Sequence, residues 1–284
     1  MKKFFIALTL SLFITPLFAQ ATDQAGGKSN PVQNTFGTTT LIDMATTESP
    51  FKHSLELQIQ HRFSVIDNIH DLYGIYGSAN TRISLHYGIT DRLSIGVGTT
   101  KDYKLQDISW KYKILQQTED NSMPVSLAYY GNIVADLRTE DNFAPPTSKF
   151  KQIHRLSFLT QLILARKFSE KISAEIAPSL SYFNTVTRYD DTHGYKNLNL
   201  GISAGARANL FGNNSLVLEY DQLLTKQDLA TQPKPNLAAG WEIGTGTHSF
   251  QIFVANYNQI IYQRNLVYND NGKYLIGFNI HVRF

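Results

Sequence analysis

The stretch KYLIGFNIHVRF, Lys273 to Phe284, alternates between two kinds of side chain. Its even-numbered positions are aliphatic or aromatic, from Tyr274 to Phe284, and its odd-numbered positions are polar, charged or glycine, with Leu275 as the one departure. Successive side chains of a β-strand point to opposite faces. The stretch therefore predicts a strand with one apolar and one polar face.

The same alternation recurs along the chain from residue 51 onward. The alternating stretches are 53–63, 81–88, 92–98, 105–115, 124–135, 154–167, 171–183, 198–209, 215–224, 236–243 and 248–257. Their polar positions are mostly Ser, Gly, Gln and Asn, which suit a wet lumen better than the outer face of a soluble sandwich. With the last stretch, the pattern predicts about twelve strands, most of them near the roughly 9 to 11 residues that a tilted membrane strand needs.

The connections between these strands alternate in length. Short links such as 89–91 and 168–170 fall at every second position, and longer ones such as 136–153 and 258–272 lie between them. Outer-membrane barrels have short periplasmic turns and longer extracellular loops. The predicted fold is thus all-β: a transmembrane, antiparallel, up-and-down β-barrel of about 12 strands, closed by a C-terminal strand that ends in Phe284.

The residues before the barrel divide into two parts. Residues 1–21 place two lysines ahead of an apolar run and small residues, which predicts a secretory signal peptide cleaved after Ala21 or Ala19. Residues 22–50 are rich in Thr, Gly, Asn and Gln and are expected to form a periplasmic N-terminal segment, followed by the barrel at 51–284. Within that segment, TTTLIDM at 38–44 is interpreted as a short strand, as a piece inside the barrel mouth, or as part of a mobile tail.

Composition narrows the function classes. Charged residues make up 17% of the chain and aromatic residues 12%, and this aromatic content suits the interfacial girdles of a membrane barrel. The formal charge is +3, and removal of Lys2 and Lys3 with the signal peptide lowers it to 24 − 23 = +1, which gives no electrostatic reason to bind nucleic acid. The chain has no cysteine, so a disulfide framework and a cysteine-ligated metal are excluded.

Three motifs support a family resemblance. They are ANTRISLHYGITDRLSIGVG at 79–98, HRF at 61–63 and WKYKILQQ at 110–117. Together they resemble an uncharacterised outer-membrane β-barrel family of Bacteroidota, catalogued as a domain of unknown function. The resemblance implies an outer-membrane location and a barrel, and it implies no substrate and no catalytic residues. The terminal Phe284 resembles the assembly signal of outer-membrane barrels in general, which implies outer-membrane lipid and the barrel-assembly machinery as partners.

Charged side chains on the polar faces are the candidate site. The lumen-lining candidates are Glu56, Arg62, Arg82, His86, Lys111, Lys113, Arg155, Glu175, Arg207, Glu219, Glu242, His281 and Arg283. Such a lumen predicts a narrow channel for passive passage or uptake of small polar solutes, and the slight excess of bases favours anionic ones. The alternative is a non-conducting structural barrel, or one that binds a ligand or partner through the loops 136–153, 184–197 and 258–272.

Catalytic and metal-binding patterns are weak. The predicted inward serines lie away from the outward histidines His61 and His154, and the chain has no G-x-S-x-G motif, so we expect no hydrolase. The segments DDTHG at 190–194 and YNDNG at 268–272 carry oxygen ligands, but the same residues are common turn formers. We therefore expect no metal and no cofactor.

Overall fold

The protein is described by a computed structural model that covers residues 29–67, 69–143, 149–190 and 192–284. The predicted signal peptide lies outside these residues and remains a prediction. The compact unit Pro31–Phe284 contains the whole barrel. No helix in the described ranges is long and apolar enough to cross a membrane.

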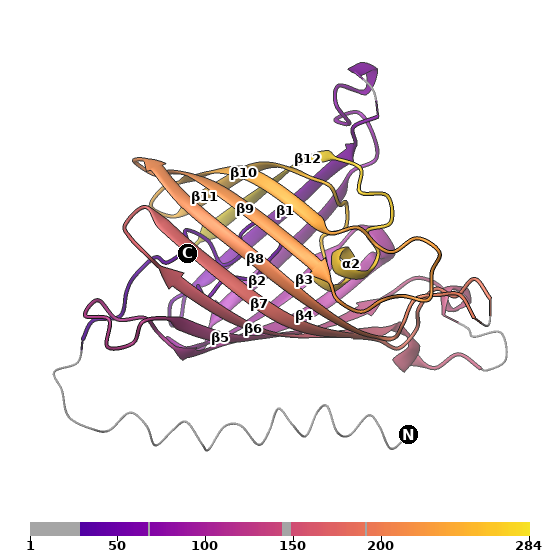
Figure 1. The fold of residues 1–284 in the computed structure, drawn as a ribbon, viewed down its shortest axis with the longest axis horizontal. Helices are drawn as coiled ribbons and strands as arrows, with labels where there is room; N and C mark the ends of the chain where they lie inside the picture. The colour runs from indigo at the N-terminus through magenta and orange to yellow at the C-terminus, as the bar shows by residue number, and fades with distance from the viewer. Residues whose placement is uncertain (1–28, 68, 144–148, 191) are drawn as a thin grey trace. The chain divides into compact units, whose positions relative to one another are not determined.

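The described residues form a closed antiparallel barrel in which each strand pairs with its neighbours in the sequence and β1 pairs with β12 (Figure 1). The strands are β1 (Leu55–Val65), β2 (Asn80–Gly88), β3 (Leu93–Thr100), β4 (Leu105–Leu115), β5 (Ser126–Asp136), β6 (Leu156–Lys167), β7 (Ile172–Phe183), β8 (Leu198–Phe211), β9 (Asn214–Leu223), β10 (Asn236–Gly244), β11 (His248–Ala255) and β12 (Leu275–Arg283). The helical pieces are η1 (Ile69–Asp71), η2 (Asp102–Lys104), η3 (Glu140–Asn142), η4 (Gln152–Arg155) and α2 (Tyr262–Val267). The predicted fold class and the strand number are confirmed.

Side-chain burial follows the period of two. In β11, Ile252 and Val254 are 61% and 44% exposed, whereas Gln251 and Phe253 between them are 0% and 2% exposed. Apolar side chains on the outside and polar ones inside are the reverse of a soluble protein, and they match a barrel surrounded by lipid. The alternation predicted from the sequence therefore has the correct register.

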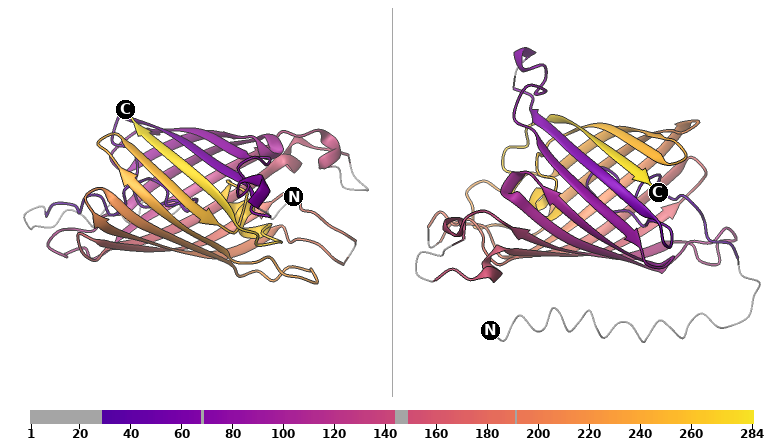
Figure 2. Two further views of the ribbon diagram at one scale, coloured as in Figure 1. Left: turned by 90° about the horizontal axis from the view of Figure 1, so that it is seen from above. Right: turned by 180° about the vertical axis from the view of Figure 1, so that it is seen from behind.

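The two ends of the barrel differ. Short connections and the C-terminus lie at one end and the long loops at the other (Figure 2). Following the rule for outer-membrane barrels, we call the end with short turns periplasmic and the other extracellular. The β3–β4 connection, Lys101–Lys104, is the one short link among the extracellular loops.

The lumen is filled from both ends. We call residues 35–48 the plug and residues 256–274, which include α2, the strap. The plug is a hairpin-shaped loop that turns at Leu41–Met44, where Leu41 N–H donates to Met44 O at 2.9 Å. The chain on either side of the plug bonds to the periplasmic rim, because Val32 N–H donates to Gln117 O at 2.8 Å and His53 N–H to Gly88 O at 2.7 Å.

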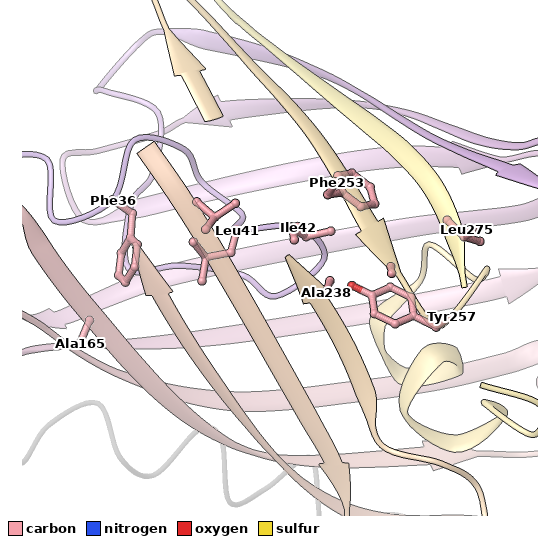
Figure 3. Close-up of a cluster of buried hydrophobic side chains, with 10 residues drawn as sticks. Phe36, Leu41, Ile42, Ala165, Ala238, Phe253, Tyr257 and Leu275 are labelled. Carbon is pink, nitrogen blue, oxygen red and sulfur yellow. The ribbon is translucent and has the colours of Figure 1, made fainter. Parts of the chain in front are cut away.

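Apolar plug residues contact the inner wall. Phe36, Leu41 and Ile42 lie in one buried cluster with residues of the barrel wall and of the strap, such as Phe253 and Tyr257 (Figure 3). Of the three interpretations of TTTLIDM, the structure has the segment inside the barrel. Its side chains do not alternate between lipid and lumen, because both sides of the segment face the barrel wall.

Candidate functional site in the barrel lumen

The plug tip is held by one carboxylate of the wall. Glu219 of β9 is 3% exposed, and its Oε2 accepts the backbone N–H groups of Ile42, Asp43 and Met44 at 3.0, 2.9 and 3.0 Å. Its Oε1 accepts the hydroxyl of Tyr257 at 3.0 Å. Consecutive N–H groups that converge on an anion form a nest, and charge-assisted bonds of this kind are stronger than neutral ones.

Asp43 at the tip meets both the wall and the strap. Its Oδ1 forms an ion pair with Arg62 and accepts Gln60 Nε2 at 3.3 Å, and its Oδ2 accepts Asn265 Nδ2 of the strap at 2.7 Å. Burial raises the pKa of Asp43 to about 7, with Arg62 acting in the opposite direction and Glu219 adding to the rise. Asp43 thus links the two segments that fill the barrel.

The two arms of the plug are bonded to the wall both through the plug backbone and through the hydroxyls of Thr38 and Thr39. Lys111 Nζ donates to Thr39 O at 2.9 Å and to Glu48 O at 2.6 Å. At the periplasmic mouth Arg283 Nη2 donates to Gly37 O at 3.0 Å. Gly37 also fits closely, because a Cβ there would lie 2.3 Å from Glu242 Oε1.

The strap lies at the extracellular end of the lumen. Tyr262 of α2 is hydrogen-bonded through its hydroxyl to Ser203 of β8, and Gln263 Nε2 donates to Asn132 Oδ1 of β5 at 3.0 Å. Leu266 packs against Gly201, where a Cβ would meet Leu266 Cδ2 at 2.4 Å. The strap therefore contacts the wall at β5 and at β8, which are three strands apart in the barrel.

Little space remains between these segments. The plug, the strap and the β1–β6 wall line a cavity of about 50 Å³ whose lining includes Asp43, Arg82, His86 and Lys111. A water molecule needs at least ~10–15 Å³ of such space, so the cavity holds about four waters. In this state the lumen has no room there for a solute.

Most of the predicted lumen residues do face the lumen or its periplasmic mouth. Buried inside are Glu56, Arg62, Arg82, Lys111, Glu175, Glu219, Glu242 and His281, and partly buried at the wall or mouth are His86, Lys113, Arg207 and Arg283. Many are paired: Arg207 with Glu242 at 2.8 Å, and Glu56 with His281 at 3.2 Å and with Arg283 at 3.0 Å. Glu175 differs from these, since neither of its carboxylate oxygens has a hydrogen-bond partner.

Arg155 requires a correction. It is the last residue of η4, outside the strands, and its Nη1 donates to Asp136 O at 2.9 Å at the extracellular rim. The predicted strand begins at His154, whereas β6 begins at Leu156, so the prediction starts the strand two residues too early. Arg155 therefore does not line the lumen.

Sequence reasoning left several site residues outside the candidate set. Asp107 accepts Arg82 Nε and Nη2 at 2.9 and 2.7 Å, and Asp221 accepts Asn236 Nδ2 at 3.2 Å. Both stand at polar positions of predicted strands, so the alternation could have found them. They offset the expected excess of lumenal bases. Asp43 and Asn265 lie in irregular segments, where no periodicity pointed to them.

Carboxylates of the two loop segments considered for metal accept hydrogen bonds from other residues of the loops. Asp190 Oδ1 accepts the backbone N–H groups of Thr192 and His193 at 2.7 and 2.6 Å, and Asp270 accepts the hydroxyl of Tyr195. Among the residues that the structure describes, no group of His, Asp and Glu side chains is arranged to hold a metal ion.

Comparisons with known proteins agree with this architecture. A family model described as a membrane-bound β-barrel domain of unknown function matches residues 36–284, a range that includes all of the plug except Thr35. Among solved structures, the NanC porin is 7% identical, with 81% of this chain and 98% of that chain covered and a TM-score of 0.52. The KdgM porin is also 7% identical with the same coverage and a TM-score of 0.47. At this identity the NanC likeness shows the fold alone, and no curated protein sequence matches the chain.

Proposed function

Because the chain belongs to the family of membrane-bound β-barrel domains, we propose that it is a gated outer-membrane channel for small polar solutes. In this proposal the plug closes the lumen at rest, and solutes pass when the plug leaves through the periplasmic mouth. The fold is compatible with a channel and with a non-conducting barrel, so the proposal rests on how the plug is held.

The observation that carries the proposal is the polar, water-replaceable nature of the contacts between plug and wall. Glu219, Lys111 and Asn279 all bond to the plug backbone, the last through Nδ2 to Ile42 O at 2.8 Å. Water can take the place of a backbone partner for each of these side chains, so departure of the plug leaves them solvated rather than unsatisfied.

The wall left behind is polar. Gln58, Gln60, Gln251 and Asn279 face the lumen together with charges of both signs and are at most 3% exposed while the plug is in place. Because Asp107 and Asp221 balance the lumenal bases, we propose small polar solutes without a preference for anions. The anionic preference expected from the sequence does not enter the proposal.

The second candidate is a non-conducting barrel that acts through its extracellular loops. The observation in its favour is that segments enter the lumen from both ends, with apolar anchors such as Leu41 and Leu266 that are 0% and 2% exposed. This candidate requires that the plug never leaves. The two candidates therefore differ in whether removal of the plug opens a path.

The test is solute entry into proteoliposomes that contain the full chain or a variant in which residues 35–48 are replaced by a Gly-Ser linker of equal length. We expect slow swelling in small sugars with the full chain and at least a tenfold faster rate with the linker variant. Heat-modifiable mobility on gels shows that both barrels are folded. Equal, slow swelling of the two folded barrels would favour the non-conducting barrel.

A further inference from the structure

Arginine side chains and aromatic rings alternate along the extracellular rim. We call this set the arginine column, and its members in order are Phe150, Arg155, Phe143, Arg138, Tyr103, Arg264 and Tyr268. Each guanidinium carbon lies 3.9 to 5.7 Å from the ring centroids on either side of it. These distances are those of cation–π contacts, which hold the guanidinium planes in place.

Arg138 and Arg155, the two arginines of the column beside the ends of β5 and β6, are placed at the level of the membrane surface. Arg138 follows the end of β5 by two residues, and Arg155 directly precedes β6. Their neighbours Leu137 and Ile153 are apolar and 50% and 41% exposed. In an outer-membrane barrel lipid headgroups begin where the outward apolar band ends, and we place that level beside these two apolar side chains.

The two arginines retain unshared donors. Arg138 uses Nε and Nη2 on Asp136, and Arg155 uses Nε and Nη1 on Gln152 Oε1 and on backbone carbonyls. A guanidinium has five N–H groups, and no described residue accepts from Arg138 Nη1 or Arg155 Nη2. The exposed Lys104 and Lys151 add positive charge to the same rim.

We propose that Arg138 and Arg155 bind the phosphate groups of an outer-leaflet lipid whose acyl chains lie against the β5–β6 face of the barrel. Guanidinium groups suit phosphate because their planar N–H pairs match its oxygens. The exposed apolar neighbours place the lipid chains beside the same two arginines. The column thereby connects a lipid contact on the outer rim with Arg264 of the strap.

The test measures how much phosphorylated lipid A, and how much of its dephosphorylated form, the refolded barrel binds in detergent by native mass spectrometry. For the Arg138→Gln/Arg155→Gln double variant we expect at least a tenfold loss of affinity for the phosphorylated lipid and no change for the dephosphorylated one. The matched control is Arg166→Gln, because Arg166 stacks on Phe168 at 5.5 Å at the periplasmic end of β6. The control is expected to bind like the unmodified chain.

Two outcomes would overturn the proposal: equal affinity of the double variant and the unmodified chain, or displacement of the lipid by inorganic phosphate at equal concentration, which would indicate a free-anion site. Heat-modifiable mobility verifies folding. If the double variant does not fold, Lys151→Glu at an exposed position replaces it and is expected to weaken binding at least threefold. Unchanged binding of folded Lys151→Glu would then count against the lipid.

Discussion

Glu219 is the single residue on which the docking of the plug depends most. One oxygen of its carboxylate satisfies three successive N–H groups of a buried turn that has no other described acceptor for them. A buried donor without an acceptor costs ~1–3 kcal/mol. Loss of this carboxylate should therefore release the plug without disturbing the strand pairing around it.

The corresponding prediction concerns Glu219→Leu and Glu219→Gln in a chain that carries Thr47→Cys as its one thiol, since the natural sequence has no cysteine. Thr47 is 6% exposed in the plug, so its reaction with a membrane-impermeant maleimide reports plug release. We expect the leucine variant to react more than tenfold faster, which corresponds to a loss of ~1.4 kcal/mol in docking free energy. The glutamine variant should react only a few-fold faster, because its amide oxygen still accepts hydrogen bonds.

The control is Glu175→Leu, which removes a lumenal carboxylate without hydrogen bonds. If the control accelerates the reaction as much as Glu219→Leu, the role given to Glu219 is wrong.

A second prediction at this scale concerns pH. Asp43 has a pKa raised to about 7 in the docked plug, against an ordinary value of 3.8, and it faces Arg62, Glu219, Gln60 and Asn265. The docked state therefore binds more protons than the released state between these values, so docking weakens as the pH rises through that window. Bilayer recordings should show more frequent opening at pH 8 than at pH 5, and Asp43→Asn should remove the difference. A variant with the full pH response would contradict this assignment.

At the scale of elements, the strands were predictable and the two filling segments were not. Alternation of the kind seen from Leu275 to Arg283 is imposed by the contrast between lipid and lumen, so it appears in every strand and gives both their positions and their register. Most residues of the plug and of α2 in the strap are buried against protein, and their burial leaves no period in the sequence. Asp43 and Asn265, whose side chains meet at 2.7 Å, come from segments 222 residues apart, so only the fold brings them together.

The register of β9 gives a stability prediction. Leu218 lies in mid-strand and is 46% exposed on the lipid face, whereas Phe211 is 63% exposed where β8 ends at the periplasmic rim. Arginine costs about 2–4 kcal/mol at the bilayer midplane and about 0–1 kcal/mol near an interface. Reversible refolding into lipid vesicles should therefore show a much larger loss for Leu218→Arg than for Phe211→Arg. Similar losses would mean that the depth assigned to β9 is incorrect.

The whole molecule is a polar-walled barrel into which two of its own segments fold. The plug and the strap meet at Asp43 and at Glu219, which bonds both to the plug tip and to Tyr257 of the strap. This arrangement explains how a wall rich in charge can coexist with a cavity of only about 50 Å³. The account predicts that the barrel conducts when the plug is absent and that the plug alone restores closure.

The most direct measurement is single-channel conductance of the barrel in which a Gly-Ser linker replaces residues 35–48, with a synthetic peptide of residues 31–50 added to one side at a time. The account predicts steady conductance that the peptide blocks in a dose-dependent way from the side of the short turns. A scrambled peptide of the same composition should have no effect. A linker variant that inserts and stays silent, or one that both peptides block equally, would contradict the central claim that the plug is the gate.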